Sequence, residues 1–235
     1  MEESVGGKNH KAVTGGGTRL WNLPRGWAHQ SFFYLDRTQR IGRVVFEVAP
    51  TVLFAVLIGK FGGVPLTNVW LWCGSLLLAH TLNWVFNGNW WAGLLFAFPG
   101  LRNRGDRATC DYLNRMADRL RRDRSIAGAM LFGSAARGQW HERSDLDLRL
   151  LRRRGLGNGI AGVLVLSRER WIALWAGQPV DIYLADGIAF LRRMRRDETP
   201  LFLKKDDPRL DLVYPAGRET RIETLKMNHC GTMAS

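Results

Sequence analysis

The sequence predicts an α+β domain, with a mixed β-sheet and flanking helices, preceded by an α-helical hairpin that crosses a membrane. Three observations carry this prediction. Short apolar runs typical of strands border turn-rich segments between residues 126 and 185. Segments with helical periodicity separate these runs. Finally, no Asp, Glu, Lys or Arg occurs between Lys60 and Arg102, which is typical of a membrane-embedded stretch.

Two apolar runs form the predicted hairpin. A helix from Trp72 to Trp90 would be about 27 Å long at ~1.5 Å per residue, close to the hydrocarbon thickness of a bilayer. Tryptophans at both of its ends suit the membrane interfaces. The earlier run, Val44–Gly59, is a weaker spanning candidate, because it is short and contains Glu47 and Pro50. A re-entrant or interfacial hairpin, and a buried core of a soluble protein, remain alternatives.

The charge distribution gives the hairpin an orientation. The chain has a formal net charge of +13, which in a soluble protein suggests nucleic acid as the partner. Here the bilayer is the expected partner instead, because arginines flank the hairpin on both sides while the loop within it carries only Lys60. Both termini and the α+β domain are therefore expected in the cytoplasm. The flanking arginines are Arg37, Arg40, Arg43, Arg102, Arg104 and Arg107.

The domain boundaries follow from these patterns. The N-terminus is polar and Gly-rich and resembles no cleavable signal peptide. The three cysteines have no paired spacing, so no disulfide framework or zinc site is expected. The expected divisions are a flexible, juxtamembrane arm (1–40), the hydrophobic helical hairpin (41–101), the α+β domain (102–215) and a polar tail (216–235).

Within the α+β domain, apolar periodicity predicts the order of the elements. An amphipathic helix comes first, with Leu113, Met116, Ala117 and Leu120 as its apolar stripe. The expected elements after it are a strand (126–132), a second strand (146–151), a helix from Asn158 to Gly177, a strand around Asp181, a helix from Gly187 and a further, edge strand from Leu201.

One segment of this domain carries a chemical signature. Gly133 and Ser134 form a turn twelve residues ahead of Asp145, which begins an Asp-x-Asp pair with Asp147. Backbone N–H groups at such a turn can hold phosphate oxygens. The two aspartates share one face of a strand, because residues two apart point the same way. Paired carboxylates beside a phosphate-binding turn suit two Mg²⁺ ions.

The whole pattern resembles the signature of the DNA polymerase β superfamily of nucleotidyltransferases. It is most similar to the minimal nucleotidyltransferase branch, which includes kanamycin nucleotidyltransferase-like enzymes and nucleotidyltransferase antitoxins. The resemblance covers roughly residues 107–215 and implies a third carboxylate on a later strand. Asp181 matches that position, whereas Asp186 is a weaker candidate that suits a helix N-cap. The matching residues of the signature are Phe132, Gly133, Ser134, Arg137, Gly138, Ser144, Asp145, Leu146 and Asp147.

The resemblance implies transfer of a nucleoside monophosphate from an NTP, with ATP expected, to a hydroxyl acceptor. Asp145, Asp147 and Asp181 would bind two Mg²⁺ ions, and Asp181 would also orient or deprotonate the acceptor. Gly133 and Ser134 would hold the β- and γ-phosphates. Arg137 would either offset phosphate charge or pair with a surface acid. Arg149 departs from the pattern, and it could neutralise the carboxylates, contact a phosphate or weaken metal binding.

The acceptor is open at this stage, and so is the class of function. A lipid-linked molecule or a protein would suit an acceptor at a membrane. One alternative function is an antitoxin-type or regulatory nucleotide-binding module that acts through a protein partner. Another is a membrane structural protein with a degenerate site. The polar stripe of His80, Asn83 and Asn87 predicts either hydrogen bonds between the hairpin helices, which we favour, or a functional contact.

Overall fold

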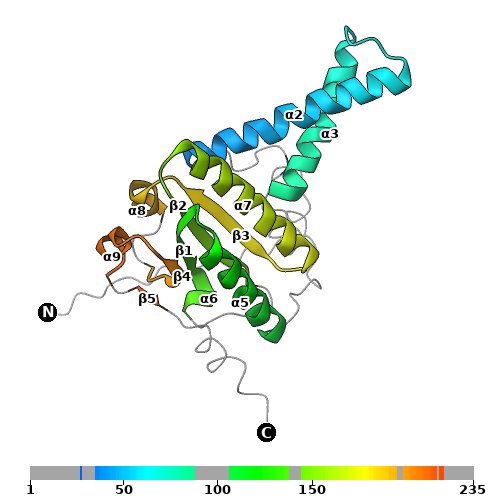
Figure 1. The fold of residues 1–235 in the computed structure, drawn as a ribbon. Helices are drawn as coiled ribbons and strands as arrows, with labels where there is room; N and C mark the ends of the chain where they lie inside the picture. Colours follow the sequence, from blue (N-terminus) through cyan, green and yellow to red (C-terminus); the bar gives the residue numbers. More distant parts are fainter. Residues whose placement is uncertain are drawn as a thin grey trace, which may run out of the picture.

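A mixed five-stranded sheet organises the molecule, with the strand order β3-β2-β1-β4-β5 (Figure 1). The computed structural model describes residues 27, 35–87, 106–137, 144–194, 198–215 and 217–219. β2 pairs in parallel with β3, and β4 with β5, whereas β1 is antiparallel to both of its neighbours. The predicted α+β fold with a mixed sheet is confirmed. The strands are β1 (Ile126–Phe132), β2 (Leu146–Arg152), β3 (Val180–Ala185), β4 (Leu201–Lys205) and β5 (Arg218–Glu219).

Helices pack on both faces of this sheet. α5 (Asp106–Arg122) and α7 (Leu156–Trp175) cover the face that bears Leu131, Leu148 and Ile182. The opposite face, with Met130 and Leu151, is covered in part by short helices. Alternating side chains of one strand therefore enter two separate cores. The short helices are α6 (Gly133–Ala136), which follows β1 directly, and α8 (Ile188–Met194) and α9 (Arg209–Val213), which supply the second core.

α5 binds to the sheet through its predicted stripe and through its C-terminus. Leu113, Met116, Ala117 and Leu120 are all buried. The Lys204 Nζ atom on β4 donates to the carbonyl oxygens of Leu120, Arg121 and Asp123, at 3.1, 3.2 and 2.6 Å. A cation at this end satisfies carbonyls that have no partner within the helix. The buried ammonium group therefore fixes where α5 ends.

α7 packs on the sheet with small residues together with Val165 and Leu166, and leaves other large apolar residues exposed. A Cβ atom at Gly162 would lie 3.3 Å from the Leu184 side chain, so the helix approaches β3 closely there. Ile160, Leu164 and Trp175, which contribute to the helical periodicity of the sequence, are exposed. The predicted helix is confirmed, but its most hydrophobic side is not the one that packs on the sheet.

The predicted hairpin consists of α2 (Arg37–Gly62) and α3 (Val69–Asn87), which project from the sheet domain (Figure 1). Each helix is long and apolar enough to cross a membrane. α2 continues through Pro50 and ends where Gly63 adopts a left-handed conformation, with a φ of 65°. Trp90 and Trp91, predicted to lie at the second membrane interface, fall outside the described residues.

The seam between α2 and α3 is lined by small and polar residues. Every fourth residue of α3 is buried along this seam, from Leu71 to Asn87, and Ala55 is its buried counterpart on α2. Small residues let two helix backbones approach closely without a core of large side chains. Large apolar residues cover the outside instead, and exposed examples are Val45, Leu53, Val56, Leu76 and Leu77.

Hydrogen bonds join the two hairpin helices. The carboxylate of Glu47 on α2 lies 2.8 Å from His80 Nδ1 and accepts a hydrogen bond of 2.6 Å from Asn83 Nδ2. Asn87 Nδ2 donates in turn to Asn83 Oδ1 at 3.0 Å. The structure thus confirms that the polar stripe of α3 makes interhelical hydrogen bonds.

The first turn of α2 attaches the hairpin to the edge strand β3. Asp36 caps α2 by accepting from its first N–H, and its second oxygen accepts from the Asp186 N–H at 2.8 Å. The Gln39 side chain accepts from the Leu184 N–H at 2.8 Å. Asp186 itself accepts from the Thr38 N–H at 2.8 Å. The expectation that Asp186 caps the helix after it is therefore wrong, because its carboxylate caps α2, a helix distant in sequence.

The C-terminal part of the sheet differs from the sequence prediction in one respect. The strand from Leu201 is not an edge, because β5 pairs with it on the side away from β1. β5 lies in the stretch that the sequence assigned to the polar tail, since alternation is invisible in so short a strand.

Candidate active site

The Gly133 turn sits where β1 ends and α6 begins. Gly133 has a φ of 75°, in the left-handed region that non-glycine residues avoid. A Cβ atom at this position would lie 2.8 Å from Asp147 Oδ2. The structure identifies the carboxylate of Asp147 as the group that excludes it.

Asp147 and Asp181 lie next to each other on adjacent strands. They are register partners in the parallel pairing of β2 and β3, so both side chains leave the same face of the sheet. Asp147 also pairs with Phe132 of β1, which places it directly beside the Gly133 turn. The shared face predicted for Asp145 and Asp147 is not tested, because β2 begins at Leu146. Asp145 lies half-buried just before β2 begins.

The environment of Asp181 favours its protonated form. Burial raises the pKa of Asp181 to about 6, the Arg149 guanidinium opposes this rise, and the negative charges of Asp147 and Asp145 add to it. Asp147 on β2 and Asp145 just before it are therefore close enough to disfavour a negative charge on Asp181. A carboxyl group with such a pKa can accept a proton near neutral pH.

Arg149 is the basic residue closest to this pair. Its Nη2 atom lies 3.7 Å from Asp147 Oδ1, and its guanidinium stacks over the Tyr183 ring, 4.4 Å from the centroid. Nη1 donates to the carbonyl oxygens of Leu148 and Asp181, at 2.9 and 3.4 Å. Of the three roles considered from the sequence, neutralisation of the carboxylates is the one this geometry supports.

A second acidic residue, Glu198, occupies the Gly133 turn. Its carboxylate accepts a hydrogen bond of 3.2 Å from the Gly133 N–H and lies 3.1 Å from Arg137 Nη1. The pairing of Arg137 with an acid, one of its two predicted roles, is confirmed. A backbone N–H and a guanidinium that hold a carboxylate also have the chemistry to hold a phosphate. Ser134 is half-buried next to this turn.

The carboxylates of the site are chemically suited to bind a divalent cation, but their arrangement in the described part of the chain does not form a metal-binding group. Carboxylate oxygens are the ligands that Mg²⁺ prefers, and the mutual repulsion of Asp147 and Asp181 is what a bound cation would relieve. Within the described ranges, however, no group of three or more His, Cys, Asp or Glu side chains is placed to hold one ion. The predicted convergence of Asp145, Asp147 and Asp181 into one cluster is therefore not seen.

Two neighbours of the site escaped the sequence prediction. Glu198 is 65 residues from Gly133, and no local pattern marks an acid that reaches back over such a distance. Tyr183 was readable only as part of a strand, although its position two residues after Asp181 places it on the same face. Gly138, His141 and Glu142, which the sequence places in the loop of the signature, lie outside the described residues.

Comparison with known proteins supports the same chemistry. Residues 113–216 match the family model of the nucleotidyltransferase domain. The match begins in α5 and includes the Gly133 turn, Asp145, Asp147, Asp181 and Glu198. No curated protein and no solved structure matches the chain. This part of the chain is thus similar to nucleotidyltransferase domains, which supports nucleotidyl transfer in general.

Proposed function

We propose that this protein is a membrane-anchored nucleotidyltransferase that transfers an NMP group from an NTP, with ATP expected, to a hydroxyl acceptor. One observation carries the proposal. Asp147 and Asp181 lie in register on one face of the sheet, and Asp147 contacts the space that Gly133 leaves open. The family match over residues 113–216 supports this interpretation of the geometry.

Each residue of the site has a definite part in this function. Asp147 and Asp181, with Asp145 nearby, would hold Mg²⁺, which stabilises negative charge on the phosphates when it is bound. The Gly133 N–H, Ser134 and Arg137 would hold the outer phosphates of the NTP once Glu198 gives way. Asp181 would accept the proton of the acceptor hydroxyl, because its raised pKa makes it a better base than an exposed aspartate.

The hairpin supports the membrane part of the proposal. α2 and α3 bury small and polar residues between them and expose large apolar ones, and arginines lie in the first two turns of α2 and follow the apolar stretch. This arrangement suits two helices surrounded by lipid, with both termini and the sheet domain in the cytoplasm. A lipid-linked acceptor or a membrane protein acceptor would then be within reach of the site.

The function is tested by nucleotide transfer in membranes. Full-length protein in detergent or native membranes is incubated with labelled NTPs and Mg²⁺, and the labelled fraction is identified. The double variant Asp145→Asn/Asp147→Asn should remove the labelling, while Asp118→Asn, an exposed acid on α5, should leave it unchanged. Labelling that persists in a folded double variant would remove these carboxylates from the reaction.

A second function is favoured by the charges that already occupy the site. Arg149 lies beside Asp147, and Glu198 occupies the Gly133 turn. Both contacts suit an antitoxin-type or regulatory module that binds nucleotide and acts through a protein partner, with little transfer. NTP binding without any labelled product, in the presence of native membranes and Mg²⁺, would favour this alternative.

A further inference from the structure

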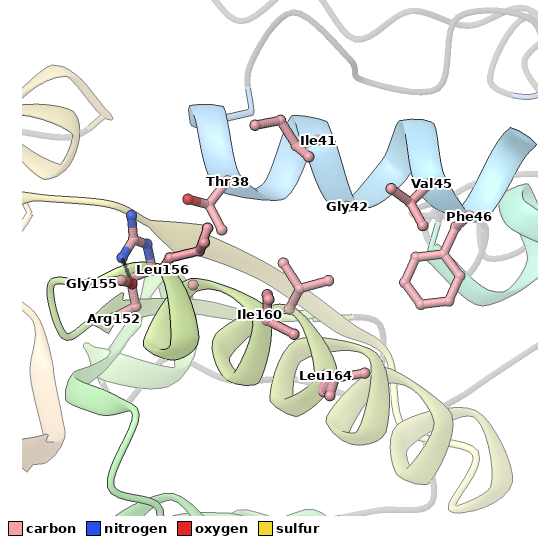
Figure 2. A pocket seen from close by; sticks show the side chains of 12 residues that line it. Thr38, Ile41, Gly42, Val45, Phe46, Arg152, Gly155, Leu156, Ile160 and Leu164 are labelled. Carbon is pink, nitrogen blue, oxygen red and sulfur yellow. Dashed lines mark hydrogen bonds between the residues drawn. The ribbon is translucent and has the colours of Figure 1, made fainter. Parts of the chain in front are cut away.

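A groove of about 560 Å³ lies between α2 and α7 (Figure 2). Its floor is the contact between the two helices, where a Cβ atom at Gly42 would lie 2.7 Å from the Val163 side chain. Its walls are aliphatic and aromatic, and the main lining side chains are Ile41, Val45, Phe46, Leu156, Ile160 and Leu164. The volume is in the range of ordinary ligand sites, roughly 300–1,000 Å³.

The walls of this groove are exposed to an unusual degree. The exposed fraction is 85% for Leu156, 59% for Ile160 and 60% for Leu164, and it is 57% for Val45 on the other wall. Monomeric soluble proteins rarely leave a contiguous apolar patch of this kind uncovered. The outer face of α2 continues the patch from Val45 toward Val48 and Val52, which are exposed as well. The groove is thus one end of the apolar surface of the hairpin.

Positive charge gathers at the end of the groove formed by Thr38 and Gly155. Arg37 precedes Thr38 and Arg154 precedes Gly155 in the sequence, and both side chains are exposed; Arg154 also lines the neighbouring polar pocket with Asn158 and Asp207. No ion pair joins either of them to another described residue, whereas Arg152 is paired with Asp186. The acid nearest in sequence, Asp36, is already engaged as the cap of α2. An apolar channel with cations at one end complements an amphiphile with an anionic head.

We propose that the groove between α2 and α7 binds an acyl chain of an anionic phospholipid, with the lipid phosphate against Arg37 and Arg154. This inference rests on the membrane attachment in the proposed function. The lipid is not the acceptor, because the head end lies beside Asp186, five residues along β3 from Asp181, or about 16 Å at 3.3 Å per residue. The bound lipid holds α7 against the bilayer and fixes the orientation of the site.

The test is photolabelling of the full-length protein in vesicles. The protein is reconstituted in phosphatidylcholine, with trace phosphatidylglycerol or phosphatidylcholine that carries a diazirine on its acyl chain. After irradiation, tryptic peptides are mapped, and residues 155–168 form one such peptide on α7. The proposal predicts strong labelling of this peptide. It also predicts a preference of about fivefold or more for the phosphatidylglycerol probe, as expected for arginines near an anionic headgroup.

Two variants separate the acyl chain from the headgroup. Ile160→Ser/Leu164→Ser should reduce labelling of α7 by several-fold, because the walls lose their apolar contacts. Arg154→Gln should remove most of the headgroup preference. Each has a matched control on an exposed surface away from the groove: Leu212→Ser on α9 and Arg122→Gln at the end of α5.

The labelling of residues 44–60, a tryptic peptide of the hairpin, distinguishes the failure of this proposal from that of membrane attachment. If this peptide is labelled and the α7 peptide is not, the groove does not bind lipid, although the anchor stands. If neither is labelled, membrane attachment fails as well. Equal labelling by the two probes, or cross-links that join α7 to a second copy of the chain, would also overturn the proposal.

Discussion

The sheet domain and the α2–α3 hairpin bury opposite kinds of side chain. In the sheet domain, Leu131, Leu148 and Ile182 are completely buried, and many of the exposed residues are charged. In the hairpin, Ser75 and Asn83 are buried at the seam, and the large apolar residues face outward. The first pattern is stable in water, whereas the second exposes too much apolar surface for water and suits lipid. The chain therefore has one region, the sheet domain, whose surface suits water, and another, the hairpin, whose surface suits lipid.

The two regions meet at a polar joint beside the candidate site. Arg170 of α7 donates to the Ile182 carbonyl oxygen at 2.5 Å and to Asn87 Oδ1, at the end of α3, at 3.4 Å. Burial lowers the pKa of Arg170, and the neighbouring Arg43 guanidinium lowers it further. Because Ile182 follows Asp181 directly, the base of the hairpin is attached to the strand that carries one of the proposed catalytic carboxylates.

The largest expected effect is on NTP binding at the Gly133 turn of the sheet domain. Gly133→Val should abolish measurable NTP binding, a loss of about 100-fold or more, because the side chain would collide with Asp147 and the backbone has a positive φ. Binding is measured with a fluorescent NTP. Gly187→Ala is the control, since nothing lies within 4 Å of a Cβ atom there and its φ is ordinary. Unchanged affinity in Gly133→Val would place the nucleotide elsewhere.

A charged residue on the outer face of the hairpin tests whether that face lies in lipid. Leu77→Lys adds a cation to the outer face of α3, at a cost of about 2.5–3.5 kcal/mol if that face lies in the bilayer centre. The fraction of protein that resists alkaline carbonate extraction should fall clearly. Leu212→Lys, at a still more exposed position on α9, should not change it. Full-length protein in the soluble fraction without detergent would contradict the anchor and make the hairpin a buried core or an interface between copies.

Within the sheet domain, the burial of the Asp181 carboxyl destabilises the folded state, and the pH dependence of stability measures this cost. Its pKa rises from 3.8 to about 6 on folding, so the folded state loses stability as the pH rises through this window and carries the full deficit above it. A shift of about two units corresponds to roughly 3 kcal/mol as an upper value. In EDTA, Asp181→Asn should therefore be more stable than the wild type at pH 8.

The gain in Asp181→Asn should shrink as the pH falls toward 4, because the wild-type carboxyl is then protonated in the folded state and partly protonated in the unfolded state. Thermal unfolding of the wild type and the variant in detergent, at several pH values, measures this gain in stability. Asp118→Asn, at an exposed acid, should show no comparable gain. A destabilised Asp181→Asn at pH 8 would mean that the ionised carboxylate makes a favourable contact in the folded protein.

The smallest expected effect concerns Glu198. Glu198→Gln keeps the shape of the side chain but removes the negative charge that the Gly133 turn and Arg137 hold. NTP affinity should increase about threefold to tenfold, because the phosphates no longer displace a carboxylate. Titration of both proteins with a fluorescent NTP measures this change in affinity. Weaker binding would show that Glu198 supports the turn rather than competing at it.

The sequence was sufficient for features that depend on local pattern. Alternation and periodicity located β1 to β4 and α5, and the Gly133 turn with its Asp-x-Asp pair predicted the segments that form the site. The hairpin was predicted from the absence of charge after Lys60. These signals are local because side-chain direction has a fixed period in strands and helices.

The remaining features depend on contacts between distant parts of the chain. Asp186 matched an N-cap by its position, but the N-terminus of α2 takes its carboxylate. Glu198 reaches the Gly133 turn from a segment that carries no motif. The groove arises because α7 packs on the sheet through Gly162 and leaves several large residues outside, which periodicity alone does not reveal.

The source of the label that reaches the acceptor tests the central claim most directly. Native membranes that contain the full-length protein are incubated with Mg²⁺ and NTP labelled at either the α- or the γ-phosphate, and Asp147→Asn is carried in parallel. Nucleotidyl transfer predicts stable product label from the α-phosphate only, and its loss in Asp147→Asn. Product label from the γ-phosphate, or α-label that Asp147→Asn leaves unchanged, would contradict a nucleotidyltransferase centred on this carboxylate.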